Sequence, residues 1–258
     1  MFQTAARHPD TSCLSPLQAS LPPATEDQAS SHRITMGLDH IQRAVAIQRR
    51  IVRQGDFLYQ AGKPFTHLFV INTGMFKVVN LSRDGREQIV GLKYRGDWMG
   101  FDGIADLRHD CDAVAMDTGE VWSISYDALL QAGVREPALM AALHRAMSVE
   151  IARDRGSLIS VCTLPADARV ADFLSNWAAA LACRGLRTDQ VTMRMTRAEI
   201  GNYLGLTLET VSRALSRLDR EGLIRFVDKS RRELHLPDLP ALRDFVRQAV
   251  EPAVTALQ

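Results

Sequence analysis

The stretch TRAEIGNYLGLTLETVSRALSRLDR, residues 196–220, has the pattern of two short helices joined by a sharp turn. Ile200 and Leu204 lie one helical turn apart, and Gly205 follows them where a tight turn needs a small residue. The apolar stripe continues after the turn at Leu206, Val211, Leu215 and Leu218. We therefore expect a helix-turn-helix, although a generic hairpin of two helices would satisfy the same apolar positions.

The charge around this segment favours binding to nucleic acid. Nine basic and five acidic residues lie between positions 191 and 232, whereas the whole chain has a net charge of only +1. The basic residues are Arg194, Arg197, Arg213, Arg217, Arg220, Arg225, Lys229, Arg231 and Arg232. A basic surface displaces counterions from phosphate, which supplies most of the non-specific affinity for DNA. Two short segments, 223–226 and 233–236, enclose a turn at 228–230, as the strands of a wing would.

The second helix presents a polar face that could read bases. Glu209, Ser212 and Arg213 lie at positions i, i+3 and i+4, so they project from one side of its N-terminal half. A recognition helix inserts this end into the major groove, where arginine reads guanine and a carboxylate accepts from cytosine. The full set of expected DNA-binding residues is Glu209, Ser212, Arg213, Thr207, Thr196 and Arg217. A polar face that is merely solvated is the alternative interpretation.

Upstream, residues 51–125 contain short segments of β-branched and aromatic residues, separated by turns. The turns contain glycine, and they lie at 54–56, 61–63, 73–74, 83–85, 95–97 and 117–119. Glycine supplies positive φ, and Asp beside it favours tight turns, so this spacing predicts a compact antiparallel barrel or sandwich. The segments 68–71 and 76–79 flank Gly74 as the two strands of a hairpin would.

Beyond Pro137 the pattern is that of one long helix, which Pro165 ends. Residues with the spacing of a coiled-coil seam, alternately 4 and 3 apart, are Met140, His144, Met147, Ile151, Asp154, Leu158 and Val161. We expect this seam to form a homodimer interface, and a helix packed only on its own sensor domain is the alternative. Asp154 would face its symmetry mate there and weaken association until a proton or a cation compensates.

The remaining segments and the composition set further limits. Residues 1–33 are rich in Ala, Ser, Thr and Pro and lack a period of 2 or 3.6, so we expect a disordered arm, followed by a short helix at 38–48. With 46% hydrophobic and 24% charged residues, the chain has the composition of an ordinary folded protein. No apolar run is long enough to span a bilayer and no signal peptide is evident, so we expect a cytoplasmic protein without a membrane partner. The cysteines, Cys13, Cys111, Cys162 and Cys183, lack the spacing of a zinc site or a disulfide framework.

Together these motifs resemble the CRP/FNR superfamily of transcription regulators. IGNYLGLTLETVSR, residues 200–213, is similar to the recognition segment of the FNR branch, including its Glu-x-x-Ser-Arg motif. Further segments similar to the β-roll of the family are GDFLYQAGKP (55–64), INTGMFKV (71–78), DGREQIVG (84–91) and GDWMGFDGI (96–104). The resemblance covers about residues 38–240. It implies a homodimer on a TTGAT…ATCAA palindrome near promoters, with Arg213 on guanine and Glu209 on cytosine.

The sensor chemistry of the family does not carry over to this sequence. FNR holds an iron-sulfur cluster with N-terminal cysteines and one in the β-roll, whereas here the arm has only Cys13 and the matching β-roll position is Trp122. CRP-like pockets pair Gly-Glu with Arg-Ser or Arg-Thr, whereas the corresponding stretches here are GFDG (100–103) and DCDA (110–113). Acidic groups would repel a cyclic phosphate. We expect no cofactor and no metal, the cluster 109–112 being a polar hairpin tip, and the small-molecule effector is unidentified.

The sequence thus predicts an α+β fold. Its parts are a disordered arm (1–33), an antiparallel β-roll similar to cyclic nucleotide-binding domains (34–135), a dimerisation helix (136–163), a winged helix-turn-helix (164–240) and a C-terminal tail (241–258). The predicted function is that of a transcription regulator, an activator that works with double-stranded DNA and RNA polymerase. No catalytic motif indicates an enzyme. The alternatives are a regulatory cyclic-nucleotide-type module of an enzyme or channel, and a DNA-binding protein without an effector.

Overall fold

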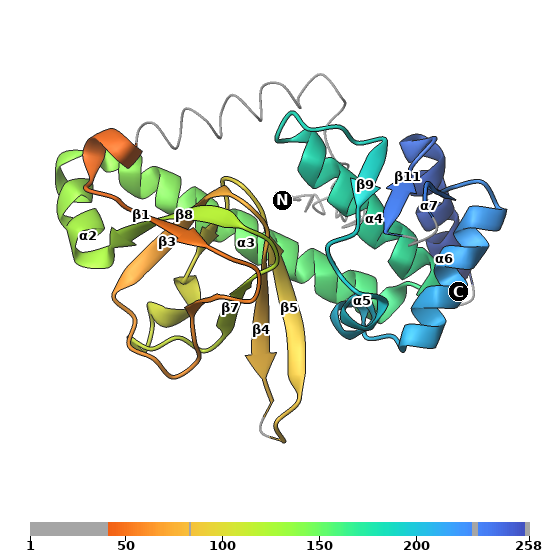
Figure 1. The fold of residues 1–258 in the computed structure, drawn as a ribbon, viewed down its shortest axis with the longest axis horizontal. Helices are drawn as coiled ribbons and strands as arrows, with labels where there is room; N and C mark the ends of the chain where they lie inside the picture. The colour runs from red at the N-terminus through yellow and green to blue at the C-terminus, as the bar shows by residue number, and fades with distance from the viewer. Residues whose placement is uncertain (1–40, 83, 229–231, 256–258) are drawn as a thin grey trace, which may run out of the picture.

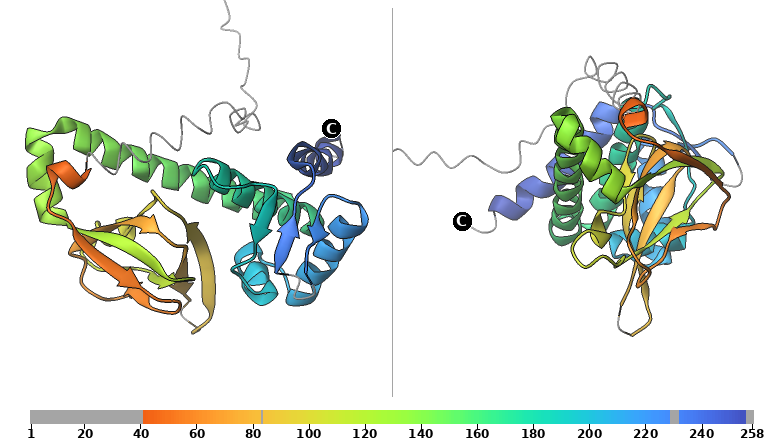
Figure 2. Two further views of the ribbon diagram at one scale, coloured as in Figure 1. Left: turned by 45° about the horizontal axis from the view of Figure 1, so that its top comes forward. Right: turned by 90° about the vertical axis from the view of Figure 1, so that its left-hand side faces the viewer.

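The structure, a computed structural model, describes residues 41–82, 84–228 and 232–255. The predicted arm at 1–33 lies outside the described residues. The α+β fold is confirmed. Figure 1 shows a β-roll on the left and a helical unit with a small sheet on the right, and Figure 2 shows the long helix α3 (Pro137–Thr163) running along both.

The β-roll is built from antiparallel strands. They are β1 (Gln48–Val52), β2 (Phe57–Tyr59), β3 (His67–Thr73), β4 (Phe76–Leu81), β5 (Glu87–Lys93), β6 (Trp98–Met99), β7 (Asp112–Ala115) and β8 (Gly119–Ser125), with the 3-10 helix η1 (Phe101–Gly103) after β6. The strands form sheets of order β1-β8-β3-β6 and β2-β7-β4-β5. Side chains from both sheets fill the space between them, among them the buried Phe69, Ile71, Phe76 and Val121. The hydrophobic effect of this burial holds the sheets face to face.

The hairpin predicted around Gly74 is wrong, because β3 and β4 belong to different sheets. Strand β3 pairs with β6 and β8, and β4 pairs with β5 and β7. The chain passes from one sheet to the other at Gly74, where φ is 94°. A Cβ on Gly74 would lie 2.9 Å from the Cα of Gly119, and one on Gly119 would lie 2.4 Å from the carbonyl oxygen of Thr73. Two glycines therefore let the corner pack closely, and alternation of residues alone could not reveal which sheet each strand joins.

The ends of the β-roll differ from the prediction in two details. Residues 41–44 are helical and β1 already begins at Gln48, so the helix expected at 38–48 ends earlier. The helix α2 (Tyr126–Arg135) was not anticipated. Ser125 caps α2 by accepting a hydrogen bond from the backbone N–H of Ala128. Helix α2 folds back on α3, where a Cβ on Gly133 would meet the side chain of Met140 at 2.5 Å.

Helix α3 is continuous over Pro137–Thr163 and ends before Pro165, in agreement with the sequence pattern. Leu139 and Leu143 in its first half are buried against the outer face of the β-roll. In its second half, Ser157 Oγ lies 3.3 Å from Tyr203 Oη, and Ser160 donates a hydrogen bond of 2.9 Å to Asp172. One helix thus contacts both units of the chain.

The helical unit contains α4 (Ala166–Ala182), β9 (Gln190–Thr192), α5 (Arg197–Leu204), α6 (Leu208–Arg220), β10 (Arg225–Phe226), β11 (Glu233–His235) and α7 (Leu239–Thr255). The sheet has the order β10-β11-β9, so the two predicted strands of the wing pair with each other. The tip of the wing at 229–231 lies outside the described residues. The tail expected from residue 241 differs from the structure: α7 buries Leu242 completely in the core of this unit.

The glycine corner gives a test of the β-roll. Gly119→Ala places a methyl group against the backbone of Thr73, and we expect it to lower the free energy of unfolding by about 1–3 kcal/mol. Gly156→Ala is the control, because nothing lies within 4 Å of a Cβ there and the residue is exposed on α3. That substitution should stabilise the helix by about 0.5–1 kcal/mol. Urea unfolding of both variants measures the free energies of unfolding. Equal stability of Gly119→Ala and wild type would contradict the close packing of Gly119 on Thr73.

Candidate nucleic-acid interface

The predicted helix-turn-helix is confirmed, and its turn depends on two glycines. Gly205 ends α5 with φ at 66°, a left-handed conformation that glycine adopts without strain. The backbone N–H of Leu206 donates to the carbonyl oxygen of Gly201 at 2.8 Å. A Cβ on Gly201 would lie 2.5 Å from the carbonyl oxygen of Leu206, so only glycine lets the turn lie this close to α5. The turn therefore fixes α6 rigidly on α5.

Helix α6 buries one side and exposes the other. Its buried residues are Val211, Ala214, Leu215 and Leu218. Thr207 caps the helix, since its hydroxyl accepts a hydrogen bond of 3.2 Å from the backbone N–H of Thr210. Glu209 and Arg213 are exposed on the opposite side, and Ser212 is half-buried beside them. The structure therefore brings together the three residues of the predicted reading face.

The charge state of Glu209 suits an acceptor. A hydrogen bond from its own backbone N–H lowers the pKa of Glu209 below the ordinary value, and the hydroxyl of Thr207 and the charge of Arg213 lower it further. The lowered pKa means that the carboxylate keeps its negative charge down to a pH below that of a free glutamate. It can accept from a base amine throughout the neutral range.

Arg197 holds Ser212 in place, a role that the sequence did not reveal. Arg197, at the start of α5, donates from Nη1 to Ser212 Oγ at 3.3 Å. Its guanidinium lies 5.9 Å from the ring centre of Phe226 in β10. Arg197 therefore links the first helix, the reading face and the wing. The position of Arg197 just before the first apolar residue of α5 marks it as a residue of the first turn. Its pairing with Ser212 could not be predicted, because it depends on how α5 and α6 cross.

A groove runs along α6 beside the reading face, and the residues that line it are Asp167, Thr210, Ser212, Arg213, Ser216, Arg217 and Arg220. Ser216 and Arg220 were not among the predicted DNA-binding residues. They lie on the same side of the helix as Glu209 and Arg213. This could have been read from their helical spacing in the sequence. Arg217 lies here as expected, but its guanidinium is paired with Asp167 at 2.6 Å and with Glu221 at 2.8 Å.

Thr196 lies apart from this group. It caps α5, where its hydroxyl accepts a hydrogen bond from the backbone N–H of Glu199 at 3.2 Å. The Glu199 carboxylate in turn accepts from the backbone N–H of Thr196 at 2.9 Å, which completes a capping box. The structure thus gives the hydroxyl of Thr196 a partner within its own helix.

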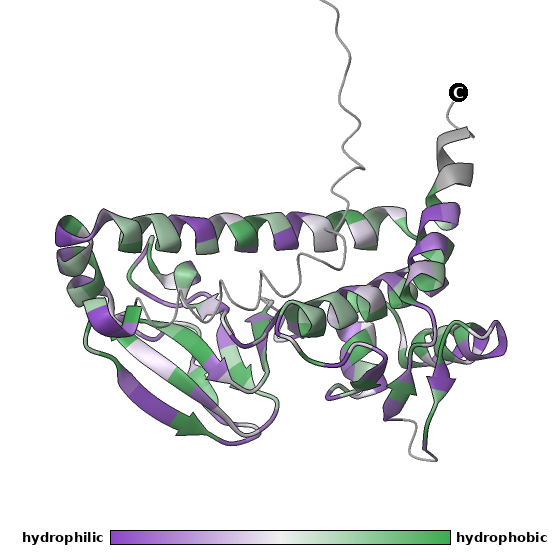
Figure 3. Cartoon of the chain, turned by 90° about the horizontal axis from the view of Figure 1, so that it is seen from above, coloured by the Kyte–Doolittle hydropathy of each residue, from purple (hydrophilic) through white to green (hydrophobic). Residues whose placement is uncertain are grey.

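The predicted seam residues of α3 fall into two sets. Exposed members are His144, Ile151, Asp154 and Leu158, and half-buried members are Met140, Met147 and Val161. Ile151 is 48% exposed and Leu158 is 63% exposed, so both predicted seam residues leave apolar surface in contact with solvent. Figure 3 shows hydrophobic residues interspersed with hydrophilic ones along α3. A straight helix has 3.6 residues per turn, so a 3.5-residue repeat drifts around it and turns part of the seam toward its own chain.

Asp154, the acidic member of the predicted seam, is exposed on α3. Burial is the main cause of the raised pKa of Tyr203 in α5, and the charge of Asp154 adds to it.

An acidic side chain lies in the segment of the β-roll that was compared with a cyclic-phosphate pocket. Asp102 in η1 accepts hydrogen bonds from the backbone N–H of Asp110 at 2.9 Å and of Cys111 at 3.3 Å. Burial raises the pKa of Asp102, but His109 and the backbone N–H of Asp110 outweigh it and hold the pKa below its ordinary value. The negative carboxylate thus occupies the backbone donors in the segment where the family binds phosphate, and it would repel a second anion.

The same segment contains the histidine and the cysteine of the cluster at 109–112. Within the described ranges, no group of three or more His, Cys, Asp or Glu could hold a metal ion. His109 is buried and stacks on Tyr59 with ring centres 3.9 Å apart. Burial and the charge of Asp102 raise the pKa of the Cys111 thiol to about 11, so the thiol is protonated at neutral pH. Reactivity needs the thiolate, so this cysteine is a poor nucleophile.

Comparison with known proteins extends these findings. Residues 49–135 match the cyclic nucleotide-binding domain family, and residues 168–245 match the Crp-like helix-turn-helix domain family. The "Transcriptional regulatory protein btr" of Bordetella pertussis is 37% identical over 201 residues, which cover 78% of this chain and 82% of the relative. The "Transcriptional activator protein anr" of Pseudomonas aeruginosa is 35% identical over 189 residues, which cover 73% and 76%.

Among solved structures, FixK2 from Bradyrhizobium japonicum superposes with a TM-score of 0.70 at 26% identity, over 78% of this chain and 97% of that one. A β-roll joined by a long helix to a DNA-binding helix-turn-helix defines a class of transcription regulators. This chain belongs to the CRP/FNR family of that class. The curated relatives are transcription regulators, which favours this function over a regulatory module of an enzyme or channel. None of the helices in the described ranges is long and apolar enough to cross a membrane.

The cap of α6 can be tested directly. Thr207→Ala removes the hydroxyl that satisfies the backbone N–H of Thr210, and we expect the free energy of unfolding to fall by about 0.5–2 kcal/mol. Thr207→Ser keeps the hydroxyl and should be close to wild type. Chemical denaturation compares the two, and an alanine variant as stable as the serine variant would show that the hydroxyl does not cap α6 in solution.

Proposed function

We propose that the protein is a homodimeric, sequence-specific DNA-binding regulator that binds a TTGAT…ATCAA palindrome. The observation that carries this proposal is the group formed by the exposed Glu209 and Arg213 and the half-buried Ser212 at the capped N-terminal end of α6. This end of a recognition helix meets the base edges in the major groove. Arg213 would donate two hydrogen bonds to guanine, and Glu209 would accept from cytosine. The basic groove with Arg220 would contact phosphate.

The dimer in this proposal forms along α3. Ile151 and Leu158 leave large apolar surfaces exposed on one side of the helix. Burying such side chains against a second copy gains about 25 cal/mol for each Å² removed from water. A twofold dimer also matches the symmetry of a palindrome, because each subunit then reads one half-site.

The proposal includes a signal that acts through the β-roll and α3. The β-roll contacts α3 and the helical unit, so a change in the roll would reach the DNA-reading helices. The acidic segment around Asp102 argues against a cyclic nucleotide as this signal. We further propose activation through contact with RNA polymerase at promoters, in keeping with the relative named as a transcriptional activator.

Arg213 is the residue whose loss should change base selectivity. Arg213→Ala should reduce discrimination against a site with the contacted guanine replaced, by about 1–3 kcal/mol. Arg220→Ala is the matched control, since it removes a charge from the same groove. It should weaken binding to both sites equally and lower the salt dependence by about one counterion. Competition binding measures both effects. Unaltered discrimination by Arg213→Ala would contradict the assignment of Arg213 to the guanine.

Leu158 tests the dimer seam. Leu158→Lys puts a charge into the proposed interface, and we expect it to weaken dimerisation at least about tenfold because a buried, unpaired charge is costly. Ile159→Lys is the control, because Ile159 is 53% exposed and points about 100° away around the helix. Sedimentation equilibrium measures the dimer in each variant. Loss of the dimer in both variants, or in neither, contradicts this seam.

A further inference from the structure

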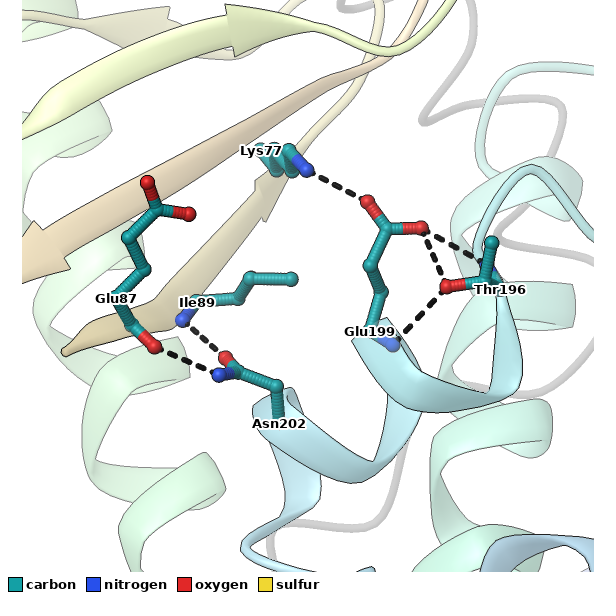
Figure 4. A network of polar contacts seen from close by, with 6 residues as sticks. All are labelled: Lys77, Glu87, Ile89, Thr196, Glu199 and Asn202. Carbon is teal, nitrogen blue, oxygen red and sulfur yellow. Dashed lines mark hydrogen bonds and ion pairs between the residues drawn. The ribbon is translucent and has the colours of Figure 1, made fainter. Parts of the chain in front are cut away.

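Helix α5 is attached to the edge of the β-roll by side-chain hydrogen bonds, as Figure 4 shows. Strand β5 is the last strand of its sheet, so its outer backbone groups lack a neighbouring strand. The Asn202 side chain fills this place. Its Oδ1 accepts from the backbone N–H of Ile89 at 2.6 Å, and its Nδ2 donates to the carbonyl oxygen of Glu87 at 2.7 Å. Both halves of one amide are used, which fixes its position and its direction.

Further polar contacts flank this amide. The Gln88 side chain donates to the carbonyl oxygen of Asn202. Lys77 in β4 lies 2.6 Å from Oε1 of Glu199, one turn earlier on α5. Burial raises the pKa of Glu199, but hydrogen bonds from Lys77 and Thr196 outweigh it and keep the carboxylate ionised. Both side chains are less than one-third exposed, so this ion pair is stronger than a typical surface pair.

Apolar packing and a second polar contact support the attachment. Met75, Val79 and Ile89 of the β-roll belong to the same buried cluster as Ile200 and Leu204 of α5. Away from α5, Asp97 of the β-roll accepts from Arg184, which follows α4, at 3.2 Å and from Arg153 of α3 at 2.9 Å. Contacts at two separate places prevent the unit from rotating about either one.

The attachment leaves the reading face free. Asn202 and Glu199 use the side of α5 that faces the β-roll, whereas Glu209 and Arg213 stay exposed on α6. Because the glycine turn fixes α6 on α5, holding α5 also holds the reading face. The β-roll in turn is packed on α3 through Leu139 and Leu143. The direction of α6 relative to the proposed dimer axis is therefore set through β5.

We propose that Asn202 and Glu199 are positioning residues, which fix α6 relative to α3 and so set the spacing between half-sites that the dimer reads. The inference rests on the proposed function, because it needs a dimer on a palindrome. Two recognition helices must lie about one turn of DNA apart to bind together. A unit that rotates freely lowers the effective concentration of the second helix at its half-site, so palindromes of all spacings become similar.

The test uses Lys77→Met/Asn202→Ala in the full chain, which leaves the capping residue Glu199 unchanged. A control double variant, Arg187→Met/Gln248→Ala, removes a basic and an amide side chain from exposed positions of the helical unit. The probes are TTGAT palindromes with the native spacer, palindromes with spacers changed by about two base pairs, and a single half-site. Fluorescence anisotropy measures the affinity for each, and sedimentation verifies that every variant is a dimer.

We expect wild type and control to prefer the native spacer by at least about tenfold, and the positioning variant to lose about tenfold in affinity for it while its preference falls to about twofold. Its affinity for the single half-site should equal that of wild type, which excludes damage to α6. The inference is overturned by a positioning variant that keeps the spacer preference, that binds the palindrome more tightly, or that loses half-site binding equally. Wild-type protein that binds none of these probes contradicts the proposed function instead.

Discussion

Helix α3 has to pack against two units along its length, and the arrangement of the chain follows from this constraint. Its 27 residues span about 40 Å at the rise of an α-helix. The first half buries Leu139 and Leu143 on the β-roll, and the second half bonds to the helical unit through Ser157 and Ser160. These contacts leave the side that carries Ile151 and Leu158 exposed. The side of α3 that remains is the one on which we place the second copy, so the dimer and the joining of the two units depend on the same helix.

Paired charges fix how the β-roll sits on this helix. Lys93 is 5% exposed and lies 2.6 Å from Glu150 of α3. Burial raises the pKa of Glu150, and the charge of Lys93 and its hydrogen bond oppose this rise. Asp97 pairs with Arg153 of α3 at 2.9 Å and with Arg184, which follows α4, at 3.2 Å. Apolar surfaces alone could slide past one another, whereas each charged group needs its partner at a definite position. The hydrogen bonds of Asn202 to the edge of β5 add a further contact of this kind.

The reading face shows how far sequence reasoning reaches. Glu209, Ser212 and Arg213 could be placed on one side of a helix because helical spacing is a local property. The same reasoning could have included Ser216 and Arg220, which continue that side. It could not identify Arg197 as the partner of Ser212, since that bond depends on the crossing of α5 and α6. The role of Thr196 could have been recognised, because Thr196 and Glu199 have the spacing of a capping box in the sequence.

The sequence by itself determined the order and kind of the parts: a β-rich segment, one long helix, and a helix-turn-helix with a wing. Periods of 2 and 3.6 residues and glycine turns are set by neighbouring residues, so they can be recognised without knowing the rest of the fold. Only the tertiary structure decided that β3 and β4 enter different sheets at Gly74, and that Asn202 pairs with Ile89 across 113 residues of chain. Strand partners and edge contacts are chosen by which surfaces can be buried together, and that depends on the whole chain at once.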